Sequence, residues 1–282
     1  MENSVLLSYP LFGSIIEITL HDVQQELVYI HQDDIIKESQ RLQKIFNLYD
    51  QTSEISMLNQ KREAIVSDEL FFVLKKALSY CEATNGLYDI SKGKLFLERK
   101  AGRLNCNNAN NVKHNYKDIL LKNNKVYLKK REVLIDLNSI AKGYVADRIA
   151  AYLKSLGFKS GIVNARGDIV CFGKQKEQIE IQHPRKKDCV IEKISCCNQS
   201  VATSGDYKQF HKTYKNSHIL GSSDLISTTV IASNLTDADA LATCCFLLGK
   251  YNASRLIQKM NCKAVLIYEN QQKELINIEE KV

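Results

Sequence analysis

Hydrophobic and polar positions along the first third of the chain follow two different periods, one typical of strands and one of helices. Residues 11–20 form an apolar, β-branched run that predicts a strand. Apolar residues at near-helical spacing predict a helix over residues 34–46. A further helix is predicted to begin after Ser67, whose hydroxyl suits a helix N-cap, and to end at Gly86.

The rest of the chain continues this mixture without a regular alternation of strand and helix. The clearest helix is predicted over residues 139–156, where Gly157 ends it. Further helices are predicted over 237–248, which Gly249 closes, and over 251–260. Short strands are predicted at 126–128, 132–137, in several pieces through 161–201, at 226–232 and at 264–268. This order predicts an α+β fold rather than a parallel α/β fold.

The composition is that of an ordinary globular chain, with 44% hydrophobic and 25% charged residues among 282. No apolar run approaches the ~18 residues that a membrane span needs, and no secretory signal precedes the first strand. The nine cysteines lack zinc-finger spacing and are odd in number, which argues against a zinc site and suits a reducing compartment. The expected localisation is therefore cytoplasmic.

The net charge of +7 comes from one segment, because residues 92–131 hold 12 Lys/Arg against 2 Asp/Glu. Such a surplus attracts a phosphate-bearing ligand or an acidic partner, or it forms a solvated, lysine-rich excursion. Few aromatic residues interleave with these charges, so nucleic acid is not an expected partner.

The candidate chemistry lies in polar clusters, since the sequence has no phosphate loop, dinucleotide fingerprint, nucleophile elbow or zincin motif. Asp239 and Thr243 share one face of a predicted helix and offer the hard oxygen ligands that suit Mg²⁺. The alternative is a capped, alanine-rich core helix. Lys142 lies in the first turn of its predicted helix, where a cation is costly unless an anion lies nearby. The alternative there is a lysine that reaches into water.

Two more candidates follow along the chain. Thr203 and Ser204 follow a strand and can hydrogen-bond a ligand, although a polar turn would have the same sequence. His218 stands alone, and a lone histidine is more often structural than catalytic.

The clusters, taken in order, resemble the FAD:protein FMN transferase family, the ApbE-like flavin transferases. The similar blocks are residues 49–59, 86–93, 136–148, 164–173, 201–210 and 238–249. The resemblance extends over residues 11–268. It implies one flavin transferase domain over residues 1–282, built of two interleaved lobes with the FAD cleft between them and the basic excursion 92–131.

The resemblance also implies an activity and a set of site residues. The implied reaction is Mg²⁺-dependent transfer of FMN from FAD to a Ser or Thr hydroxyl of a partner protein, with release of AMP. The implied metal ligands are Asp239, Thr243 and the main-chain carbonyl of Ala141. The residues implied to contact FAD are Tyr88, Asp89, Lys142, Asp147, Arg166, Thr203, Ser204 and Gly205. Catalytic roles are implied for His218, Asp239 and Lys142.

The chain departs from the family pattern at three places. Asn138 and Ser139 replace two glycines, and the Asp-Pro that usually follows the histidine is missing after His218. Arg166 replaces another glycine, where it either adds a phosphate contact or only occupies the turn. The family's acceptor motif, which resembles D-G-x-(S/T)-G-A-T, is not evident here, so the acceptor is expected to be another protein. The alternatives are a FAD pyrophosphatase giving FMN and AMP, and a non-catalytic flavin-binding protein.

Overall fold

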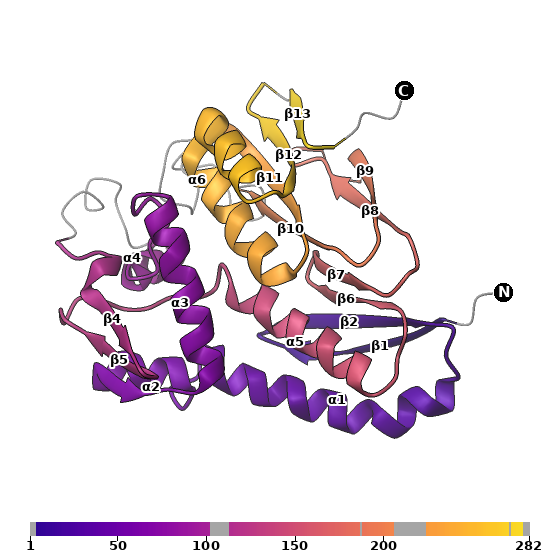
Figure 1. Ribbon diagram of the computed structural model, residues 1–282, viewed down its shortest axis with the longest axis horizontal. Helices are drawn as coiled ribbons and strands as arrows, with labels where there is room; N and C mark the ends of the chain where they lie inside the picture. The colour runs from indigo at the N-terminus through magenta and orange to yellow at the C-terminus, as the bar shows by residue number, and fades with distance from the viewer. Residues whose placement is uncertain (1–3, 102–112, 187, 206–223, 271, 279–282) are drawn as a thin grey trace.

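The apolar, β-branched runs of the sequence build an eight-stranded antiparallel sheet (Figure 1). The computed structural model describes residues 4–101, 113–186, 188–205, 224–270 and 272–278. The strand order in the sheet is β1-β2-β6-β7-β10-β11-β12-β13. These strands are β1 (Ser4–Leu11), β2 (Ser14–His21), β6 (Gly161–Ala165), β7 (Asp168–Phe172), β10 (Ser200–Gly205), β11 (Leu225–Ala232), β12 (Lys263–Tyr268) and β13 (Lys273–Ile276).

Both faces of this sheet are covered, which explains why β11 is buried along its whole length. On β12, Ala264 and Leu266 belong to the main core, while the alternate residues Val265 and Ile267 belong to a second buried cluster. Three helices cover the main-core face: α1 (Gln25–Phe46), α5 (Ala141–Ser155) and α6 (Leu235–Lys259). The second cluster lies under a hairpin of β8 (Glu177–Gln182) and β9 (Val190–Cys196).

A smaller three-stranded sheet lies beyond α5 and α6, on the side away from the large sheet (Figure 1). Its strands, in order, are β3 (Glu63–Ile65), β5 (Lys125–Leu128) and β4 (Ile119–Lys122). The neighbouring helices are α2 (Glu54–Lys61), α3 (Asp68–Ala83), α4 (Gly93–Lys100) and the short η2 (Tyr116–Asp118). The Ser67 hydroxyl accepts a hydrogen bond from the Leu70 N–H, which confirms the predicted cap of α3.

The two helices that carry Lys142 and the candidate metal ligands, α5 and α6, approach each other very closely. A Cβ atom on Gly143 of α5 would lie 2.3 Å from the Leu235 carbonyl oxygen of α6, so only glycine fits there. The N-cap of α6 is Asn234, whose side chain accepts from the Asp237 N–H. Gly249 has a φ of 70° and separates the two predicted helical segments.

Several predicted boundaries were wrong. The run 11–20 spans the end of one strand, a turn and most of the next, because Phe12 and Gly13 both take positive φ values and reverse the chain. Residues 132–137 do not form a strand; they make only an isolated bridge between Leu134 and Lys92, and β5 pairs with β4 instead. The predicted mixture of helices and strands in an α+β fold is confirmed.

In the described part of the chain, none of the helices combines the length and the apolar character that crossing a membrane requires.

Candidate functional site

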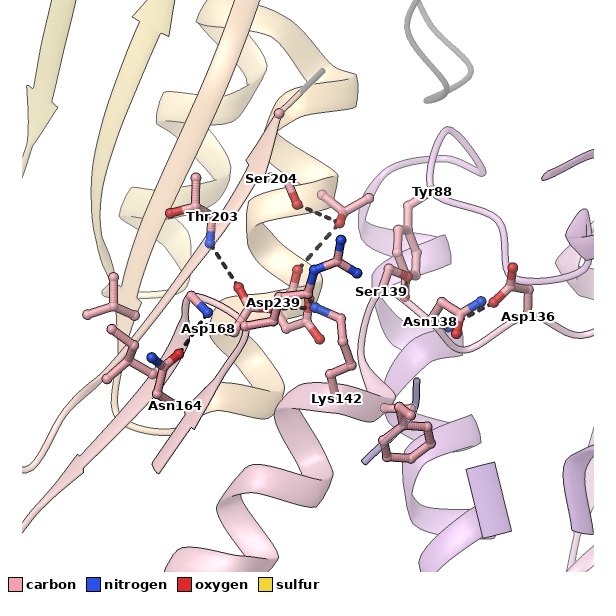
Figure 2. A pocket seen from close by; sticks show the side chains of 18 of the residues that line it. Tyr88, Asp136, Asn138, Ser139, Lys142, Asn164, Asp168, Thr203, Ser204 and Asp239 are labelled. Atoms are coloured by element: carbon pink, nitrogen blue, oxygen red, sulfur yellow. Dashed lines mark hydrogen bonds and ion pairs between the residues drawn. The ribbon is translucent and has the colours of Figure 1, made fainter. Parts of the chain in front are cut away.

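A cavity of about 890 Å³ collects most of the polar residues that the sequence singled out. That volume lies within the range of sites for small molecules and cofactors. The β6–β7 turn, β10, α5 and α6 line the part shown at the left and centre of Figure 2, and the segments around Tyr88 and Asn138 line the part at its right. Aromatic side chains of Phe12, Phe46 and Tyr49 also line the cavity.

Lys142 lies among carboxylates at the centre of the cavity (Figure 2). Its ammonium group forms an ion pair with Asp168 and lies 3.9 Å from a carboxylate oxygen of Asp239. Burial by itself lowers the pKa of Lys142, but the two carboxylates raise it well above its ordinary value, so the ammonium stays charged. The anion that a lysine in the first turn of a helix requires is thus supplied by the protein, which rules out a lysine directed only into water.

Asp239 is a buried carboxylate with few groups to balance its charge. One oxygen accepts the Gly143 N–H at 3.1 Å, and among the described residues only the Lys142 ammonium lies within 4 Å of this carboxylate as a cation. Burial raises the pKa of Asp239 to about 7, although the nearby ammonium of Lys142 lowers it. A buried acid that is only partly compensated is a common feature of functional sites.

Hydroxyl groups of β10 lie opposite the acidic side chains (Figure 2). The Ser204 and Thr243 hydroxyl oxygens are 2.9 Å apart, and the Thr203 hydroxyl lies 2.9 Å from that of Thr229. The Thr203 N–H donates to Asp168 at 3.2 Å, so this aspartate joins β7, β10 and α5. Gly205 also lines the cavity.

A second polar group surrounds Tyr88 at the other side of Figure 2. The Ser139 hydroxyl donates to the Tyr88 hydroxyl oxygen at 2.9 Å, and burial raises the pKa of Tyr88 well above its usual value. Asp89 lines the cavity as well, with one carboxylate oxygen bound by the N–H and hydroxyl of Ser91. The Asn138 N–H donates to Asp136 at 2.8 Å.

The oxygen donors around Asp239 suit a magnesium ion by their chemistry. Asp239, Thr243 and Ala141 all line the cavity, and a carboxylate, a hydroxyl and a main-chain carbonyl are hard ligands. The raised pKa of Asp239 marks a negative charge that a cation would stabilise. Within the described ranges, no three His, Cys, Asp or Glu side chains gather as a metal-binding group. A Mg²⁺ site does not need one, since Mg²⁺ is often held by one or two carboxylates, waters and substrate phosphates.

Two predicted site residues are placed differently from the rest. Asp147 does not line this cavity; its carboxylate accepts the N–H groups of Leu235 and Thr236 at 2.8 and 2.7 Å and so caps α6. These bonds give Asp147 a structural role, and the contact with FAD expected for it stays a prediction. His218 lies outside the described residues.

Asp168 is the main site residue that the sequence reasoning did not select. It follows Arg166 and Gly167 in the family-like block 164–173, but nothing in the sequence distinguishes it from an aspartate on the surface. Its importance comes from the fold, which buries it and brings it to Lys142. Phe12 is not among the predicted site residues because the run 11–20 predicts one continuous strand, whereas Phe12 lies in a turn.

A family model described as "ApbE family" matches residues 12–266 of the chain. A protein named FAD:protein FMN transferase from Buchnera aphidicola subsp. Schizaphis graminum is 28% identical over 262 residues, covering 80% of this chain and 75% of its own. One of the same name from Vibrio cholerae serotype O1 is 26% identical over 249 residues, with 78% and 73% covered.

Solved structures agree with the sequence comparison. The flavin transferase ApbE from Vibrio cholerae has a TM-score of 0.84 at 22% identity and covers 98% of both chains. The ApbE protein from Thermotoga maritima has a TM-score of 0.85 at 25% identity, with 98% of this chain and 97% of that chain covered. Fold, cavity and sequence match therefore lead to one conclusion: this chain belongs to the ApbE family.

Proposed function

We propose that this protein is an FAD:protein FMN transferase, which moves FMN from FAD to a Ser or Thr hydroxyl of a partner protein. The observation that carries the proposal is the cluster of Lys142, Asp168 and Asp239 in a cavity large enough for a dinucleotide. Membership of the ApbE family and relatives named for this activity support it.

The proposed reaction exchanges the phosphoanhydride bond of FAD for a phosphoester bond to the acceptor. The acceptor oxygen forms a bond to the phosphorus of the FMN half, and the bond from that phosphorus to the bridging oxygen breaks. AMP leaves with the bridging oxygen, and the acceptor hydroxyl loses its proton. Such a transfer depends mainly on alignment and on neutralising phosphate charge.

The residues of the cavity suit those two tasks. Lys142 carries a positive charge held in place by Asp168, and it would neutralise a phosphate oxygen. Thr203, Ser204 and Gly205 would hydrogen-bond and position the substrate, with Tyr88 and Asp89 near one of its rings. The role of His218 as proton acceptor stays a prediction, as do the cytoplasmic location and the two-lobed single domain over residues 1–282.

The proposed metal ion is Mg²⁺, held by Asp239, Thr243 and the carbonyl of Ala141. When bound, it supplies positive charge to the phosphate groups of the substrate. Lys142 stays within ion-pair distance of Asp239, so the protein also places a fixed cation beside that site.

Mass spectrometry tests the proposal directly. The protein is incubated with FAD, Mg²⁺ and a peptide that contains Asp-Gly-x-Thr-Gly-Ala-Thr, with EDTA in a parallel sample. We expect an FMN adduct on the peptide and release of AMP, both lost with EDTA. FMN and AMP without an adduct, in a reaction in which a known family acceptor protein is also left unmodified, would indicate a pyrophosphatase. Intact FAD that stays bound would indicate a flavin-binding protein without turnover.

A further inference from the structure

Two neighbouring turns at one end of the large sheet both direct a bulky residue to the cavity. The β1–β2 turn consists of Phe12 and Gly13, and the β6–β7 turn consists of Arg166 and Gly167. Because β2 pairs with β6 so that Ile16 lies opposite Ala165, the two turns lie side by side at the same edge. Phe12 and Arg166 both line the cavity.

Both bulky residues adopt a backbone conformation that disfavours them. Phe12 has a φ of 51° and Arg166 a φ of 63°, each followed by a glycine that is also at positive φ. Two-residue turns of this kind prefer Asn, Asp or Gly at the first position, because a larger side chain is strained there. Strain that persists beside a cavity is often maintained for function.

A comparison with Arg62 separates a structural arginine from one that is available to a ligand. Arg62 also has a positive φ, of 69°, but its guanidinium donates to the carbonyl oxygens of Asn59, Lys130 and Val133. Those bonds explain why an arginine is kept at that helix end. For Arg166, by contrast, no hydrogen bond or ion pair is found with any residue that the structure describes.

The charges around Arg166 are balanced in a way that allows a phosphate group to bind. Arg166 lies close enough to Lys142 for the two positive charges to interact. With Asp168 and Asp239, these four groups sum to zero, so the wall can take a doubly charged cation together with a diphosphate dianion and stay neutral. A planar guanidinium is also the side chain best matched to phosphate oxygens, which it can contact by two hydrogen bonds.

We propose that Arg166 is a specificity-determining residue of this site, whose guanidinium binds the diphosphate of the dinucleotide substrate. The inference rests on the proposed function and deepens it, since it assigns to this chain a phosphate contact from the turn rather than from Lys142 alone. The arginine that replaces a glycine of the family pattern thus adds a ligand contact as well as occupying the turn.

The test uses Arg166→Asn and Arg166→Gly, because both residues suit positive φ and neither carries charge. Binding of FAD, ADP, inorganic pyrophosphate and riboflavin is measured by calorimetry with Mg²⁺ present, beside the parent protein. Arg255→Gln is the matched control, since Arg255 is exposed on α6 outside the cavity lining and its loss changes the net charge equally. Melting temperatures without ligand are measured for every variant.

We expect the Kd values for ADP and pyrophosphate to rise about five- to thirtyfold in both Arg166 variants, and the Kd for riboflavin to change less than twofold. The melting temperature should rise by about 1–3 °C, since the strain is relieved. A stabilised protein with weaker phosphate binding is not what a purely structural arginine would produce.

Other outcomes would overturn the inference. Phosphate affinities equal to those of the Arg255→Gln control would show that Arg166 does not bind phosphate, while the parent's binding of FAD would leave the proposed function intact. An equal loss for riboflavin would show that the turn merely shapes the cavity. A parent protein that binds neither FAD nor ADP would overturn both the inference and the proposed function.

Discussion

At the scale of single residues, the site places two buried carboxylates beside one cation. Asp168 is compensated directly by the Lys142 ammonium, whereas Asp239 lies 3.9 Å from it and keeps a raised pKa. A buried acid in that state costs the folded protein free energy unless another cation is present. Function and stability therefore make opposite demands on Asp239.

Asp239→Asn is expected to separate these two demands. FMN transfer should fall by about a hundredfold or more, because the proposed metal site loses its only carboxylate. The Asn side chain can still accept the Gly143 N–H, so the protein should fold and, without divalent ions at pH 8, should be as stable as the parent or more stable. Transfer assays and urea unfolding check the two parts, and a large loss of stability at pH 8 would contradict the second.

The same carboxyl group predicts a dependence of stability on pH. Its pKa is about 7 in the folded protein against an ordinary value of 3.8, so the folded state binds this proton more tightly. Between about pH 4 and pH 7 the free energy of unfolding should therefore decrease as the pH rises, by roughly 1–3 kcal/mol from this group. Urea unfolding of parent and Asp239→Asn in EDTA should show a difference that grows from pH 5 to pH 8. A difference that stays constant would show that Asp239 does not titrate in this range.

At the scale of elements, the close contact of α5 with α6 brings Lys142 and Asp239 together. Two features of α5 make this possible. Gly143 allows the α6 backbone to approach, and its N–H binds Asp239. One turn further along, Asp147 binds the N–H groups that begin α6. The geometry of the site thus depends on Gly143 and Asp147, which do not line the cavity.

Replacement of Asp147 by Ala tests its structural role. The variant loses three hydrogen bonds to the first residues of α6, and the free energy of unfolding should fall by about 2–3 kcal/mol. Asp147→Asn keeps an acceptor and should lose less. Because Asp147 does not line the cavity, the KM for FAD of the folded variant should stay within about twofold of the parent. A raised KM at unchanged stability would instead restore the contact with FAD that the sequence suggested.

Replacement of Gly143 by Ala tests the close approach itself. The added Cβ would lie 2.3 Å from the Leu235 carbonyl oxygen, so the helices must separate. We expect a loss of about 2–4 kcal/mol in stability and a drop in transfer activity in the fraction that stays folded. The reverse exchange at an exposed position of the same helix, Ala151→Gly, should lower the free energy of unfolding by only about 1 kcal/mol. A Gly143→Ala protein as active as the parent would show that the contact is not needed.

At the scale of the whole molecule, charge is distributed unevenly along the chain, because the positive surplus is concentrated in residues 92–131. In the described part of that segment, Lys125 and Lys130 are paired with Glu63 and Asp118. Lys129 and Arg131 are exposed, and no ion pair is found for them among the described residues. Charges of this kind speed the encounter with an acidic partner and lose their effect at high salt.

Lys129→Gln combined with Arg131→Gln tests whether this segment helps to dock the acceptor protein. We expect the KM for an acidic acceptor to rise about two- to fivefold at low salt and to depend less on salt than in the parent. The control combines Arg255→Gln with Lys259→Gln, two exposed residues at the end of α6, which removes the same charge elsewhere. Identical salt dependence in both double variants would exclude a docking role for the segment.

Much of this protein follows from local sequence. The caps, stops and apolar periods predicted α3, α5, α6 and the second half of α1, because those signals act between residues that are near in the chain; α2 and α4 were not predicted. The pair Asp239 and Thr243 was recognisable because residues four apart share a helix face. The family resemblance was carried by short blocks of the same local kind, and it is confirmed.

Only the tertiary structure decided what several of these residues do. The sequence could not distinguish Asp147, which caps α6, from Asp168, which holds Lys142, because both roles depend on partners 26 to 89 positions away. It could not show that the charge of Arg166 lies near that of Lys142 either, since their proximity arises from sheet pairing and helix packing. The burial and the charged surroundings of a site residue are set by such distant neighbours. The residues next to it in the sequence do not reveal which neighbours these are.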